Sequence, residues 1–114
     1  MARRMFTTEV MAGNEFLNLP NRAQMLFVFL CLFADDDGLC GCGKSLILMT
    51  RAEISDFLLL ERRGFIYLFE SGVVYVRDFH KMNRIPRAHY TPSVYTEELA
   101  AIRRGDILPR GRLC

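Results

Sequence analysis

The chain has 114 residues, 51% of them hydrophobic and 25% charged, which excludes a chain that is disordered over its whole length. Residues 1–75 contain seven Lys/Arg and nine Asp/Glu, whereas residues 76–114 contain eight Lys/Arg and four Asp/Glu. The formal net charge of +2 indicates no partner by itself, but this asymmetry favours contact between the C-terminal part and a polyanion, with a solvated basic tail as the alternative.

The N-terminal segment and the longest apolar run indicate the cellular compartment of the protein. After the basic start MARRM, Thr7, Thr8 and Glu9 interrupt the apolar core that a secretion signal needs. The apolar run at residues 25–34 is about half the length needed to cross a bilayer, so it predicts a buried helix. We therefore expect a cytoplasmic protein without a membrane contact. Its cysteines are then expected to be reduced thiols: Cys31, Cys40, Cys42 and Cys114.

The first strong helix is predicted to open at Pro20 and Asn21, because proline suits a first helical turn. One stripe of this helix is apolar at helical spacing: Ala23, Leu26, Phe27, Leu30 and Ala34. The opposite side is apolar as well: Met25, Phe29, Leu32 and Phe33. Such a helix is central or has a second partner. It is predicted to end at the aspartates 35–37 and Gly38, with Phe16, Leu17 and Leu19 packed beside it as a short preceding turn.

Two further helices are predicted after the glycine-rich joint at residues 41–43. Residues 44–49 form a short apolar helix, and Thr50 with Glu53 has the spacing of a capping box. This box predicts a third helix over residues 51–63, closed by Gly64. Its core-facing side chains are expected to be Ile54, Phe57 and Leu58.

A β-hairpin and a basic arm follow the helices. Residues 65–69 and 73–77 are rich in β-branched and aromatic side chains, and a short loop at residues 70–72 joins them. Beyond the hairpin the chain is polar and basic, and its prolines prevent a continuous helix. One last short helix is predicted over residues 96–104, and the chain from Gly105 on is predicted to be a loose end.

This order of elements predicts an α+β fold: a winged helix-turn-helix, with a three-helix core that carries a C-terminal β-hairpin wing. The predicted domain covers residues 1–98, and residues 99–114 are expected to be a partly disordered tail. In a helix-turn-helix protein the second helix of the pair enters the major groove of duplex DNA. The ribbon of a winged helix lies along the DNA backbone.

Several short stretches resemble one known family. MARRMF, FLNLP, ADDDG, GF before FESGVVYV, and TPSVY occur in an order and spacing that resemble the N-terminal domain of phage replisome-organiser proteins. These are winged-helix replication-initiation proteins of Firmicute phages. The resemblance implies binding of phage origin DNA in the bacterial host cell and recruitment of host replication proteins. It covers residues 1–98, and it departs from the more basic family pattern at Pro86, Ala88 and Thr91.

Nine side chains are predicted to contact double-stranded DNA. Four belong to the third helix or its end: Arg51, Ser55, Arg62 and Arg63. Five belong to the hairpin exit and the basic arm: Arg77, Lys81, Arg84, Arg87 and His89. Near the start of its helix Arg51 would reach a guanine edge, and the arm would neutralise phosphates. The alternatives are a helix that only packs and a strand that its charge protects from association.

No catalytic residue, cofactor or metal site is predicted. The consecutive aspartates 35–37 point in different directions and are expected to bond turn amides. Cys40 and Cys42 are too close in sequence for the usual zinc spacing. Arg3 and Arg4 are expected to be disordered or to pair with the aspartates, in preference to binding the minor groove.

Two other functions remain open. A winged-helix transcription regulator would have the same fold and a different DNA site. A protein-interaction or dimerisation module would not bind DNA. In that case the apolar helix at residues 25–34, with Leu59 and Leu60, would supply an exposed patch, and a homodimer is expected.

Overall fold

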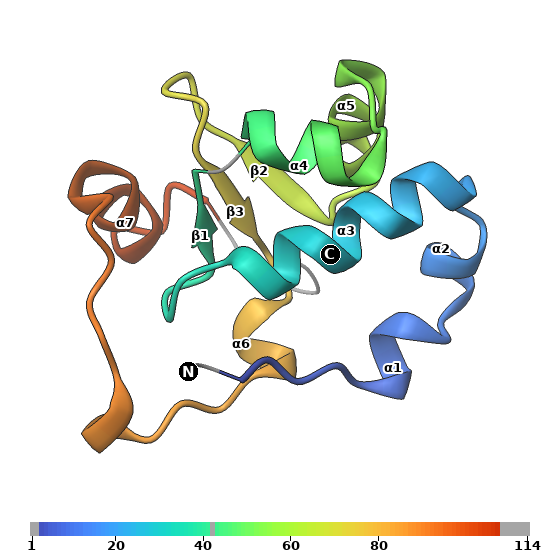
Figure 1. Cartoon of the computed structure of the whole chain (residues 1–114). Helices are drawn as coiled ribbons and strands as arrows, with labels where there is room; N and C mark the ends of the chain where they lie inside the picture. The colour runs from blue at the N-terminus through green and yellow to red at the C-terminus, as the bar shows by residue number, and fades with distance from the viewer. Residues whose placement is uncertain (1–2, 42, 108–114) are drawn as a thin grey trace.

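The computed structural model describes residues 3–41 and 43–107 of the chain. Its central element is α3 (Asn21–Phe33), which begins after Pro20 as predicted. The predicted stripe on this helix is buried: Ala23, Leu26, Phe27, Leu30 and Ala34. Two short helices, α1 (Thr8–Met11) and α2 (Asn14–Leu17), precede it (Figure 1).

Aromatic rings fill the part of the core under α2. The ring of Phe27 lies 5.7 Å from that of Phe16 and 5.2 Å from that of Phe65. Both pairs are inclined, as aromatic rings prefer. Leu19 is buried as predicted, but the prediction for Leu17 is wrong because its side chain is exposed. The short preceding helix therefore anchors itself through Phe16 and Leu19.

The turn after α3 is built by the first aspartate. Asp35 Oδ1 accepts hydrogen bonds from the backbone amides of Asp37 and Leu39, each at 3.0 Å. Gly38 has a φ of +85°, the left-handed conformation that was predicted for it. The turn leads into β1 (Leu39–Cys40), which was not predicted because two residues are too short to show strand alternation.

The second and third core helices are α4 (Gly43–Thr50) and α5 (Ile54–Arg62). The predicted capping box at Thr50 is wrong. Thr50 ends α4, and its hydroxyl donates to the carbonyl of Leu46 at 2.6 Å. The start of α5 is instead capped by Asp56, whose Oδ2 accepts from the backbone amide of Glu53 at 2.8 Å.

This later start changes which side of α5 is buried. Phe57 and Leu60 face the core, whereas Ile54 is 70% and Leu58 is 53% exposed. The prediction that Ile54 and Leu58 point inward is therefore wrong. Leu60 was assigned to an exposed patch, and that prediction is wrong as well. Gly64, with a φ of +83°, closes α5 as predicted.

The sheet has three antiparallel strands in the order β1-β3-β2. The predicted hairpin is confirmed as β2 (Ile66–Leu68) and β3 (Val74–Val76). One face packs on the helical core through Cys40, Ile66, Val74 and Val76. The other face forms a second cluster: Leu39, Val73, Tyr75 and Ile107, with Leu99 and Ile102 against them.

The second face of the sheet is covered by the end of the chain. After β3 come α6 (Phe79–Met82), η1 (Arg87–His89) and α7 (Thr96–Arg103), which lies beside the sheet (Figure 1). The helix predicted over residues 96–104 thus forms. The prediction of a loose end is wrong for Ile107, which is buried. The rest of that prediction, residues 108–114, lies outside the described residues.

The described chain is an α+β domain of several helices and one small antiparallel sheet, as predicted. Among its described residues, no helix combines the length and the apolar character that a membrane crossing requires.

Candidate functional site

The nine predicted DNA contacts do not form one surface. One group belongs to α5 and its two ends: Arg51, Ser55, Arg62 and Arg63. The other group lies on the chain after α6: Arg84, Arg87 and His89. Figure 1 shows α5 at the top of the molecule and the chain after α6 at the bottom. Arg77 and Lys81 lie between these two groups in sequence, at the base of the hairpin and on α6. Two separate groups of cations must therefore be considered.

The α5 group consists of exposed side chains. Arg51, Ser55, Arg62 and Arg63 are all exposed, and none of the three arginines has an acidic partner within residues 3–41 and 43–107. Arg51 was predicted to lie near the start of the third helix. It lies instead in the loop before α5, with a φ of +61°. The cations that the helix itself carries therefore stand at its C-terminal end.

The N-terminal end of α5 suits an anion poorly. Glu53 is largely exposed beside it, and Asp56 occupies the first turn. Ile54 and Leu58 place apolar side chains on the outward face. A phosphate at this end would meet carboxylates, which repel it.

The tip of the hairpin carries an acid and no base. Its loop, residues 70–72, has the sequence Glu-Ser-Gly, and the Ser71 hydroxyl donates to Glu98 at 2.6 Å. The first cation, Arg77, stands at the opposite end of β3, where its amide donates to the Phe65 carbonyl at 3.1 Å. Arg77 Nε is buried and has no hydrogen-bond partner among the described residues. The positive charge thus belongs to the base of the hairpin.

Lys81 differs from the arginines after it. Its Nζ lies 2.8 Å from a carboxylate oxygen of Glu9 on α1, and both side chains are largely exposed. This ion pair links α6 to α1, although so exposed a pair contributes little to stability. A phosphate at Lys81 would have to compete with Glu9, so its contribution to binding a polyanion is reduced.

The second group of cations lies on a fixed segment. Arg84, Arg87 and His89 are exposed, and in the described chain none has an acidic partner. Directly after them, the Tyr90 hydroxyl donates to both oxygens of Asp37, at 2.8 and 2.7 Å. The arm is therefore held in place at its C-terminal end.

Further bonds fasten this segment to the turn after α3. The amide of Ser93 donates to Asp37 Oδ2 and the amide of Thr91 to Asp36 Oδ2, each at 2.9 Å. The hydrogen bond that the Tyr90 hydroxyl donates to Asp37 raises the pKa of this hydroxyl above its ordinary value, with help from burial and the aspartate charge. The aspartates were expected to bond turn amides, which is confirmed for Asp35. Their role as acceptors for residues 90–93 was not predicted.

The N-terminal segment joins the same cluster. Arg4 forms an ion pair with Asp36 at 3.1 Å, donates to the carbonyl of Ala34 at 2.7 Å and lies 5.2 Å from the centre of the Phe79 ring. The expected pairing with the aspartates is thus confirmed for Arg4. Arg3 is exposed and has no acidic partner among the described residues. The backbone amide of Met5 donates to Asn83 Oδ1 at 2.7 Å, which fixes the segment against α6.

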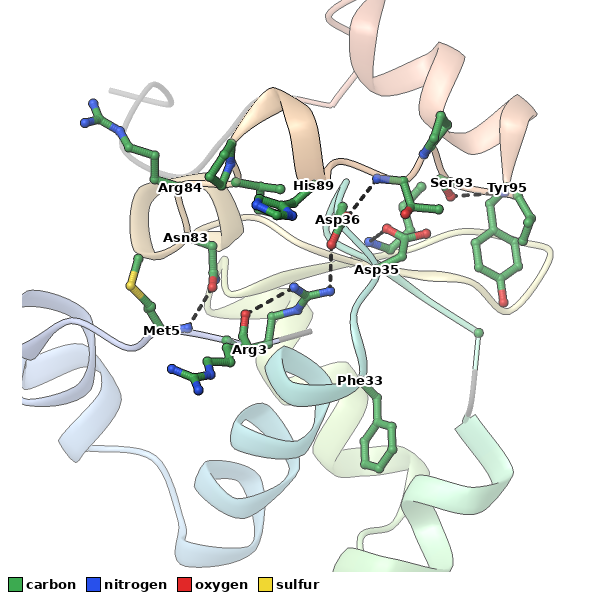
Figure 2. A pocket seen from close by; sticks show the side chains of 18 residues that line it. Arg3, Met5, Phe33, Asp35, Asp36, Asn83, Arg84, His89, Ser93 and Tyr95 are labelled. Atoms are coloured by element: carbon green, nitrogen blue, oxygen red, sulfur yellow. Dashed lines mark hydrogen bonds and ion pairs between the residues drawn. The ribbon is translucent and has the colours of Figure 1, made fainter. Parts of the chain in front are cut away.

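A cleft of about 1200 Å³ lies between these segments. Its walls come from residues 3–5, the end of α3 and residues 83–95. Figure 2 shows Arg3 and Arg84 on one side of the cleft and Tyr95 on the other. The sequence did not predict this cleft because its walls are far apart along the chain. Of the residues that line it, only Arg84 and His89 were predicted as DNA contacts.

No grouping of His, Cys, Asp and Glu within the described parts of the chain is placed to hold a metal ion. Cys31 and Cys40 are buried free thiols. Burial, and to a smaller extent the charge of Asp78, raises the pKa of the Cys31 thiol, so it is a poor nucleophile. Cys42 and Cys114 lie outside the described residues.

Large apolar side chains are exposed on all three core helices. Leu48 on α4 is 78% exposed, and Ile54 and Leu58 on α5 are 70% and 53% exposed. Other large apolar side chains of these helices are exposed too: Met25, Leu32, Phe33 and Met49. Solvent-facing apolar side chains in such number favour a contact with another protein.

Comparisons with family models, with curated proteins and with solved structures return no match for this chain.

Proposed function

We propose that this protein is a winged-helix DNA-binding protein of phage replication initiation, without enzymatic activity. The element order α3-β1-α4-α5-β2-β3 and the sheet order β1-β3-β2 support the winged-helix assignment. The role in replication rests on the motifs that resemble the replisome-organiser family. In this proposal the partners are phage origin DNA and host replication proteins in the bacterial cytoplasm.

One observation carries the proposed contact with duplex DNA. Five arginines are exposed and have no acidic partner in the described chain: Arg51, Arg62, Arg63, Arg84 and Arg87. Unpaired guanidinium groups bind phosphate oxygens without first breaking an internal ion pair. We place the main backbone contacts at the end of α5 and on the arm. The hairpin tip contributes little because it bears Glu70.

The test is the affinity for a random duplex, measured by fluorescence anisotropy over a series of salt concentrations. Replacing Arg84 and Arg87 together by alanine should make the plot of log affinity against log salt concentration less steep, by roughly the amount expected for the loss of two phosphate contacts. The double variant Arg103→Ala/Arg104→Ala is the matched control. In the unaltered protein, Arg103 lies 3.9 Å from Asp37 and Arg104 lies 2.9 Å from Asp106. Because these arginines are already paired with acids, the salt slope of this control should stay unchanged. A slope near zero for the unaltered protein would remove the electrostatic case.

A transcription regulator would pass the same binding test. Footprinting separates the two roles, because a replication protein protects a phage origin and a regulator protects a promoter. Protection confined to a promoter would reject the replication role while leaving the DNA-binding proposal intact.

A second candidate function is self-association without DNA binding. It is favoured by the exposed apolar side chains of α4 and α5, among them Leu48 and Ile54. Sedimentation equilibrium of the unaltered protein and of Ile54→Asp tests it. A tight dimer that Ile54→Asp dissociates, together with no duplex binding at low salt, would replace the first proposal by this one.

A further inference from the structure

We propose that the cleft between residues 3–5, the end of α3 and residues 83–95 binds an extended acidic segment of another protein. The segment would carry an apolar side chain between its acids. This inference goes beyond the proposed DNA contact, with which it shares Arg84 and His89, and none of its premises requires DNA binding. It rests on the charge, the lining and the size of the cleft shown in Figure 2.

The charge of the cleft is positive where a ligand can reach it. Arg3, Arg84 and His89 line it, are exposed and have no acidic partner in the described chain. The cleft also contains two acids, Asp35 and Asp36, but three of their four carboxylate oxygens are engaged. Bonds from the protein's own donors hold both of them, as described above for the turn after α3. The cations therefore remain available to carboxylates of a ligand.

The lining is apolar between these charges. Three apolar side chains line the cleft: Val94 is 81% exposed, Met5 51% and Phe33 47%. The backbone beside them is held by internal bonds, including the one from Met5 to Asn83 at 2.7 Å. An apolar ligand side chain would cover Phe33 and Val94, and burial of that area would stabilise the complex.

The size of the cleft favours a polypeptide. Small-molecule sites usually measure about 300–1,000 Å³. This cleft, at about 1200 Å³, exceeds that range and is only partly enclosed. An extended segment advances by about 3.3 Å per residue and can place acids and an apolar side chain alternately along it.

A nucleic-acid strand fits less well than such a segment. It would bring a phosphate with every nucleotide along the apolar part of the lining at Phe33 and Val94, where a charge loses water and gains no partner. A peptide can set its acids opposite Arg3 and Arg84 and its apolar side chain opposite Phe33. The mixed lining of the cleft is therefore complementary to a peptide of mixed character.

The test uses the full chain and the fluorescein-labelled peptide Asp-Asp-Phe-Leu-Asp-Asp, followed by fluorescence anisotropy. We expect saturable binding that Arg84→Glu weakens about tenfold or more, because the reversed charge repels the peptide. Val94→Asp should weaken it similarly. The matched control is Arg62→Glu, which reverses an exposed arginine on α5 and should leave the affinity unchanged. Both mutated cleft side chains are exposed, so the fold should persist, which circular dichroism checks.

Three results would overturn the inference. One is the lack of saturable binding by the unaltered protein. Another is an equal loss in Arg62→Glu, which would indicate attraction by net charge alone. The third is a labelled single-stranded oligonucleotide that binds with the same dependence on Arg84 and Val94 and displaces the peptide. Measuring duplex binding by Val94→Asp, whose side chain lies outside the proposed DNA contact, separates this result from a failure of that contact.

Discussion

The hydroxyl of Tyr90 lies 2.8 and 2.7 Å from the two carboxylate oxygens of Asp37, a residue 53 positions earlier in the chain. Asp37 is buried, and Ser93 donates a second hydrogen bond to it. This contact joins the chain that follows the hairpin to the turn that follows α3. It therefore holds both the basic arm and one wall of the cleft.

Replacing Tyr90 by phenylalanine should destabilise the protein. The change leaves the buried carboxylate of Asp37 with one donor fewer, which costs about 1–3 kcal/mol. Urea denaturation measures the change in the free energy of unfolding. Tyr67→Phe is the control, because among the described residues no hydrogen bond of the Tyr67 hydroxyl is found. Equal stability of the two variants would show that the contact contributes nothing.

Stability should also fall at alkaline pH. The hydrogen bond to Asp37 raises the pKa of Tyr90 above its ordinary value, and burial raises that of Tyr75. Folding thus favours the neutral phenols. Their contribution is complete below about pH 10, the unfolded value, and is lost as pH rises through the higher folded pKa. Urea midpoints from pH 8 to pH 11 should decline less steeply in Tyr90→Phe than in the unaltered protein; parallel curves would contradict this.

Two glycines separate backbone strain from steric overlap. Gly38 and Gly72 both have a left-handed φ, +85° and +92°. A Cβ on Gly38 would lie 2.9 Å from the Cβ of Phe79, whereas none of the described atoms lies within 4 Å of one on Gly72. Gly72→Ala should cost about 1–2 kcal/mol from strain alone. Gly38→Ala should cost clearly more in thermal unfolding, and a cost no larger than that of Gly72→Ala would mean that Phe79 yields without penalty.

Replacing Asp56 should lower the free energy of unfolding by more than replacing another polar residue of the same helix. It is buried, accepts from the Glu53 amide at 2.8 Å and from Arg22 Nε at 2.7 Å, and so ties α5 to α3. Asp56→Ala should cost about 2 kcal/mol or more, since it removes a helix cap and leaves Arg22 without this partner. Glu61→Ala is a comparison on the same helix. Glu61 accepts from the Leu68 amide at 2.7 Å and caps no helix, so its loss should cost less.

The helices and the hairpin could be predicted because their residues interact with close neighbours in sequence. The stripe of α3 and the φ of Gly38 follow from local spacing and turn chemistry. The start of α5 could not be predicted in the same way. Thr50 and Asp56 both offer caps, and only the packing of Phe57 against α3 decides between them. The strand β1 exists because β3 pairs with it.

The candidate sites were predictable only in part. A count of charges found the basic arm, and Arg84, Arg87 and His89 are indeed exposed. Whether a cation is paired depends on contacts distant in sequence, such as that of Lys81 with Glu9. The cleft has walls from three distant segments, so no single window of sequence contains its pattern.

The burial of Ile107 against the second face of the sheet bears on how the protein is made. Leu39 and Tyr75 leave the ribosome long before Ile107 does, yet they share one cluster with it. Until residues 99–107 emerge, the second face of the sheet remains exposed to water and can adhere to other nascent chains. Proteins truncated after the hairpin should for this reason aggregate, even though they retain α3, α4 and α5.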